Sequence, residues 1–168
     1  MTWFIRPVIA GLFALALAAN ASAGIANSPL PILNGKKAVH LYTVLGAVSV
    51  SFRGPIMSVI SCTSTATATI RVSFETFTEG GDVFTTDAMD VAPGATVTVS
   101  TQAVPGNAVF GANLVLGNGG GVGFGKPTPV RIGATSKALA CTAFSYNNET
   151  AAISPLTIIA KTKQKAAN

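Results

Sequence analysis

The sequence predicts an all-β protein, built as a single antiparallel β-sandwich of about eight or nine short strands with one disulfide. Segments of alternating apolar and polar residues recur along the chain, turn residues separate them, and no segment has the period of an amphipathic helix. The chain has 168 residues, of which 49 % are hydrophobic and only 10 % charged. That composition excludes a disordered protein, and the length suits one domain.

The first 23 residues have the pattern of a secretory signal peptide. Arg6 supplies the positive start, residues 8–19 the apolar stretch, and Ala21-Ser22-Ala23 the small-residue cleavage site, so the mature chain is expected to begin at Gly24. The apolar stretch is shorter than the roughly 20 residues that span a bilayer. We therefore expect export to the periplasm or the extracellular space, with no transmembrane segment in the mature chain.

Residues 24–37 contain two prolines and Asn34-Gly35, which predicts an extended N-terminal arm with a turn. The sandwich domain is expected over residues 38–161 and a basic tail over 162–168. The clearest strand is 66–77, where Val72 and Phe74 alternate with Ser73 and Glu75, so one face should be apolar and the other exposed to water. The predicted strands are 38–50, 56–63, 66–77, 95–101, 109–116, 130–134, 137–146 and 156–161.

Glycine and proline mark the breaks between these strands. Residues 79–82 and 92–94 are expected to form turns. Residues 117–125 include six glycines, so this loop is expected to be mobile or to approach another backbone closely. Residues 120–126 match the first part of the phosphate-binding motif, G-x-x-x-x-G-K. Pro127 stands where that motif needs Ser or Thr, so we expect no nucleotide site there.

Cys62 and Cys141 are the only cysteines, and an even number in an exported protein predicts one intramolecular disulfide. A structural role is expected for the pair, because the chain has no CxxC motif and only one histidine. Strand candidates carry both cysteines, a layout typical of sandwiches in which a disulfide joins the two sheets.

This layout resembles that of immunoglobulin-like (Ig-like) domains. Residues 91–97, Val-Ala-Pro-Gly-Ala-Thr-Val, are similar to a turn and strand common in bacterial Ig-like modules. Residues 130–143 resemble small secreted bacterial proteins of unassigned function. The chain departs from the Ig pattern at Leu139, where those domains often carry Tyr two residues before the second cysteine, and the mature chain lacks the core Trp. The resemblance implies an Ig-like sandwich and export, and it implies no activity.

The formal net charge of +5 depends largely on Lys161, Lys163 and Lys165 at the end of the chain. Without those lysines the mature chain is nearly neutral, so no basic face for nucleic acid is expected.

Catalytic residues and cofactors are not predicted, because His40 has no nucleophile and orienting group at motif spacing. The acidic segment 75–90 supports an alternative, a small exported hydrolase or a calcium-dependent binding protein. A calcium site would need this segment to fold back on itself and bring its carboxylates together; otherwise the cluster is a solvated sheet edge. The calcium candidates are Glu79, Asp82, Asp87 and Asp90.

Ser and Thr make up 29 of the 145 residues that follow position 23, so the polar faces of the strands should carry hydroxyl groups rather than charges. Strands with little charge pair readily with other strands. The sequence therefore favours a non-enzymatic secreted module with a structural or binding role at or near the bacterial cell envelope. Its partner would be an unknown protein, an envelope component or a second copy of the chain, paired through strands that could include the arm 24–37.

Overall fold

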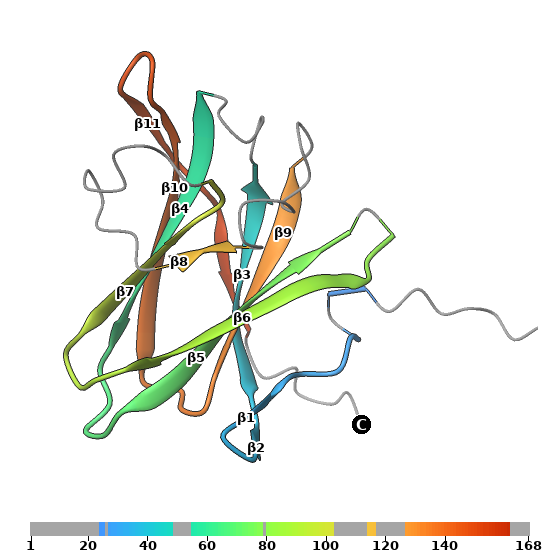
Figure 1. The fold of residues 1–168 in the computed structure, drawn as a ribbon, viewed down its shortest axis with the longest axis vertical. Coiled ribbons are helices and arrows are strands. Elements are labelled where there is room, and N and C mark those ends of the chain that lie inside the picture. The colour runs from blue at the N-terminus through green and yellow to red at the C-terminus, as the bar shows by residue number, and fades with distance from the viewer. Residues whose placement is uncertain are drawn as a thin grey trace, which may run out of the picture.

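The computed structural model describes residues 24–25, 27–48, 55–78, 80–102, 114–116 and 127–161. Within these ranges the protein consists of β-strands without an α-helix, so none of the described residues form a helix able to cross a membrane. Two five-stranded sheets make up the body of the molecule, and a short hairpin accompanies them (Figure 1). The predicted all-β class and its antiparallel sandwich are confirmed.

The first sheet has the order β11-β10-β4-β7-β8. Its strand pairs are antiparallel except for β7 with β8, which is parallel. The strands are β4 (Ile56–Ser64), β7 (Thr96–Ser100), β8 (Leu114–Val115), β10 (Leu139–Asn147) and β11 (Ala152–Pro155).

The second sheet has the order β12-β3-β9-β5-β6 and is antiparallel throughout. The hairpin of β1 (Ile32–Leu33) and β2 (Lys36–Lys37) belongs to the predicted arm. The strands of this sheet are β3 (Val39–Ala47), β5 (Ile70–Phe77), β6 (Val83–Val91), β9 (Thr128–Ala134) and β12 (Ile158–Ala160).

A single apolar core lies between the two sheets. Phe74 on β5 and Ile132 on β9 are fully buried against Ile60 and Val99 from the first sheet. Core residues on one strand are two positions apart, as Phe74 and Val72 are on β5, which is expected for sheets that each bury one face in a shared core.

The predicted disulfide between Cys62 and Cys141 is confirmed, with a sequence separation of 79. The expectation that it joins the two sheets is wrong. Cys62 on β4 and Cys141 on β10 are directly opposite each other in neighbouring strands of the same sheet. The pattern of alternation identifies strands, but it does not tell which strands are neighbours.

The nine-residue strand β6 was not among the predicted strands. The segment contains two Asp residues and follows a predicted turn, which is typical of a charged connection between strands. In the structure it pairs with β5 along its whole length. The strand lies at a sheet edge, where charged side chains reach solvent and are common.

Several of the sequence predictions fall outside the described residues. They concern the signal peptide (1–23), residue Glu79, residues 109–113 of the strand predicted over 109–116, the glycine-rich loop (117–125) and the basic tail (162–168).

Candidate functional site

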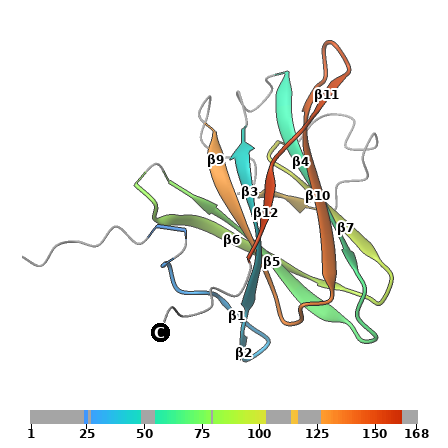
Figure 2. The ribbon, with the colours of Figure 1, turned by 180° about the vertical axis from the view of Figure 1, so that it is seen from behind.

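The N-terminal arm lies against the outer face of the second sheet, the face turned away from the core (Figures 1 and 2). Ser73 and Glu75 on β5 and Arg131 on β9 belong to this face, and all three are buried. The expectation that the polar side of residues 66–77 is exposed to water is therefore wrong for Ser73 and Glu75. The arm that covers these residues is contributed by a different part of the chain.

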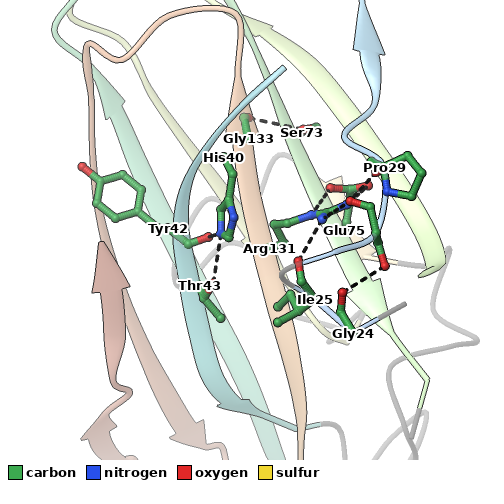
Figure 3. A network of polar contacts seen from close by, with 11 residues as sticks. Gly24, Ile25, Pro29, His40, Tyr42, Thr43, Ser73, Glu75, Arg131 and Gly133 are labelled. Carbon is green, nitrogen blue, oxygen red and sulfur yellow. Dashed lines mark hydrogen bonds and ion pairs between the residues drawn. The ribbon is translucent and has the colours of Figure 1, made fainter. Parts of the chain in front are cut away.

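Arg131 is the centre of the polar contacts beneath the arm (Figure 3). Its Nε donates to Glu75 Oε2 at 2.7 Å and its Nη2 to Glu75 Oε1 at 3.1 Å, which makes a bidentate ion pair. Nη1 donates to the carbonyls of Ile25 and Ser28 at 2.9 and 2.8 Å, and Nη2 also donates to the carbonyl of Pro29 at 2.9 Å. These five contacts use every N–H that a guanidinium has.

Two further contacts hold Arg131 and its neighbours in place. The guanidinium carbon lies 5.1 Å from the centre of the Phe77 ring, within cation–π range. On β9, a Cβ at Gly133 would lie 3.0 Å from Ser73 Oγ and 3.4 Å from Ala38 Cβ, so a glycine permits this close approach of β5, β9 and the residue that precedes β3. Arg131, held by Glu75, thus fixes the arm to the sheet, and its guanidinium has no N–H left to donate to a ligand.

A cavity of about 260 Å³ lies between the arm and the start of the second sheet. The described residues of its wall include three with cationic side chains, one with an imidazole and none with a carboxylate. The lining residues are Asn27, Ser28, Pro29, Leu30, Lys37, His40, Arg131 and Lys161.

His40 on β3 contributes the imidazole. Its Nε2 lies 3.2 Å from the carbonyl oxygen of Tyr42 and 3.0 Å from Thr43 Oγ1. Because a carbonyl can only accept, Nε2 is the nitrogen that carries the proton in the neutral ring. Burial lowers the pKa of His40, and the positive charges of Arg131 and Lys161 lower it further, against smaller opposing effects of the Tyr42 carbonyl and Glu75. His40 is therefore neutral at pH 7.

The described part of the acidic segment does not bring the calcium candidates Asp82, Asp87 and Asp90 together, and Glu79 lies outside the described residues. Asp87 and Asp90 lie on the extended strand β6, where the register sets Asp87 opposite Phe74 and Asp90 opposite Arg71, on different faces of the sheet. Asp90 Oδ1 accepts from Arg71 Nη1 at 3.2 Å. Over the part of the chain that the structure describes, no three His, Cys, Asp or Glu side chains are close enough to hold a metal ion.

Arg131 and its partnership with Glu75 were not predicted from the sequence. The only local signal is a charged residue between Val130 and Ile132 in a strand whose other polar residues are few. The register that sets Glu75 opposite Arg131 joins residues 56 positions apart, and it follows from the tertiary fold.

Comparisons with protein-family models, with curated proteins and with solved structures found no significant match to this chain.

Proposed function

We propose that the chain is an exported, non-enzymatic β-sandwich module with a structural role at or near the cell envelope, and that copies of it assemble by strand pairing. The observation that carries this proposal is the edge strand β6, whose outer side has no partner strand among the described residues. Residues 1–23 support export through their signal-peptide pattern, and the disulfide suits an oxidising compartment.

In the part of the chain that the structure describes, β6 is the longest of the four edge strands of the two large sheets. It has nine residues, whereas β11, β12 and β8 have four, three and two. Among the described residues no strand pairs with the outer side of β6. Val83 and Phe84 at its start are 38 % and 50 % exposed, and a long edge with exposed apolar residues favours pairing with another chain.

The direction of the backbone groups on β6 follows from those on β5. The carbonyl of Arg71 accepts from the N–H of Thr135, which lies on the opposite side of β5 from β6. Since this direction alternates along a strand, Phe74 directs its backbone groups to its partner Asp87 on β6. Thr86, the residue before Asp87, therefore turns its N–H and C=O outward, where a second copy can bond to them.

Light scattering on residues 24–168 over a range of protein concentrations tests the proposal. We expect oligomers that grow with concentration, and we expect Phe84→Lys or Thr86→Pro to shift the protein towards the monomer. Ile153→Lys is the matched control, because Ile153 is an equally apolar, 59 % exposed residue on the edge strand β11. A wild-type protein that stays monomeric at every concentration would overturn the proposal, as would association lost equally in the control.

A further inference from the structure

Two lysines line the cavity beside His40, and the contacts described so far leave their side chains unused. Lys37 ends β2, where it pairs with Ile32 of β1. Lys161 follows β12, and its backbone N–H donates to the carbonyl of Leu41 at 2.7 Å. No side-chain partner of Lys37 or Lys161 occurs within the described ranges, yet the backbone of each is fixed at the cavity wall.

The charge of this cavity is not balanced by the protein groups around it. Arg131 is neutralised by Glu75, which is the only buried carboxylate among the described residues, and no acidic side chain lines the cavity. Lys37 and Lys161 therefore leave an excess of positive charge in a concave site closed on one side by the arm. Such a site attracts anions.

We propose that this cavity binds the phosphate group of a small molecule, with Lys37 and Lys161 as the charge partners and His40 as the acceptor of the phosphate proton. The volume of about 260 Å³, together with the apolar side chains of Pro29 and Leu30 in the wall, leaves room for a short organic part.

The donors and acceptors at hand favour phosphate over a carboxylate. A guanidinium fork is the usual partner of a planar carboxylate, but the fork of Arg131 is fully occupied, and lysines bind phosphate as point charges. Neutral His40 keeps its proton on Nε2, so Nδ1, which has no partner within the described residues, is an acceptor. Near neutral pH a phosphate monoester still carries a proton in part of its population, because its second pKa is about 6. Carboxylate and sulfate carry none.

The charged groups that face His40 come from four elements. Lys37 lies on β2, Arg131 on β9 and Lys161 after β12, and Glu75 on β5 is paired with Arg131. A bound phosphate would offset the cations that hold the pKa of His40 down. Binding should consequently raise the pKa of this histidine, the only one in the chain.

This site lies between the arm and β3, away from the β6 edge, so it is independent of the proposed assembly. NMR of the His40 ring in residues 24–168 provides the test, with inorganic phosphate, sulfate and acetate added at constant ionic strength and pH 7. We expect saturable shifts with phosphate, a raised pKa of His40, and weaker responses to sulfate and acetate. Glycerol phosphate in solution and vesicles containing phosphatidic acid then tell whether the phosphate comes from a free metabolite or from a lipid headgroup.

The variants Lys37→Gln and Lys161→Gln should each weaken phosphate binding by about tenfold or more, the value of one charge-assisted hydrogen bond. Lys36→Gln is the matched control, since Lys36 is the neighbouring exposed lysine on β2 and does not line the cavity. Unfolding midpoints of all variants check that the fold is intact. Equal responses to all three anions, preferential binding of acetate, or an equal loss in the Lys36 variant would overturn the proposal.

Discussion

At the scale of single residues, the burial of Arg131 is the feature that most constrains the protein. A buried cation is tolerated only when its charge and all its donors are matched, and here one carboxylate and three arm carbonyls do so. The same five contacts that satisfy the guanidinium bind the arm to the sheet. Loss of Arg131 should therefore leave both the Glu75 carboxylate and the arm carbonyls without a hydrogen-bond donor.

We predict that Arg131→Met lowers the free energy of unfolding by about 3–5 kcal/mol, because it leaves the buried Glu75 carboxylate without its partner. The double variant Glu75→Leu with Arg131→Met should lose less than Arg131→Met alone, since it removes both charges. Urea unfolding of the two single variants, the double variant and the wild type measures the coupling. Losses that simply add would contradict the tight pairing.

His40 gives a second prediction at this scale, on the pH dependence of stability. Its pKa is lowered in the folded protein by burial and by the nearby cations, whereas in the unfolded chain it returns to about 6.5. Below that pH the unfolded chain takes up the proton more readily than the folded protein, so stability must fall as the pH decreases.

The measurement is the urea midpoint at intervals between about pH 7 and pH 5, above the range in which most carboxylates titrate. His40→Gln should flatten the pH dependence in this window, because the variant has no histidine left to titrate. An unchanged slope in His40→Gln would show that another group is responsible.

At the scale of secondary-structure elements, the sequence predicts where most strands lie in the chain better than which segments cover or neighbour them. Alternation identifies β5 correctly because Val72 and Phe74 face the core. It assigns Ser73 and Glu75 to solvent, since the pattern of one strand cannot show that the arm, some fifty residues earlier, covers them. The missed strand β6 has the same cause: Asp87 and Asp90 are compatible with a strand only because it lies at an edge, and position in the sheet is a property of the whole fold.

Candidate site residues show the same limit. The sequence identifies His40 as the only histidine and places it within the strand predicted over 38–50, which β3 confirms. A register shift sets His40 opposite Gly133 and Tyr42 opposite Ile132, so the two side chains lie on opposite faces of the sheet, which simple alternation does not predict. It does not bring Lys37 and Lys161, which are 124 positions apart, to one cavity, since β12 returns next to β3 only in the assembled sheet. The even number of cysteines predicts the disulfide. Its location within one sheet cannot be predicted in this way, because it depends on β4 and β10 being neighbours.

At the scale of the whole molecule, the disulfide joins cysteines 79 positions apart and closes a loop that contains β5, β6, β7, β8 and β9. Strands of both large sheets therefore lie inside one covalent loop, although the bond itself lies in the first sheet. The two sheets also share one core, in which Ile60 and Val99 pack with Phe74 and Ile132. We therefore expect the sheets to unfold together in one transition.

We predict that the double variant Cys62→Ala with Cys141→Ala unfolds in a single transition, with a free energy of unfolding lower by about 4–5 kcal/mol. This is the entropy that a cross-link of this loop length removes from the unfolded chain. Urea unfolding followed by both circular dichroism and tyrosine fluorescence measures the loss and tests whether the transitions coincide. Reduced wild-type protein is the control that separates the lost cross-link from the lost sulfur atoms. A loss below about 1 kcal/mol, or separate transitions for the two probes, would mean that the disulfide stabilises one sheet locally and not the sandwich as a unit.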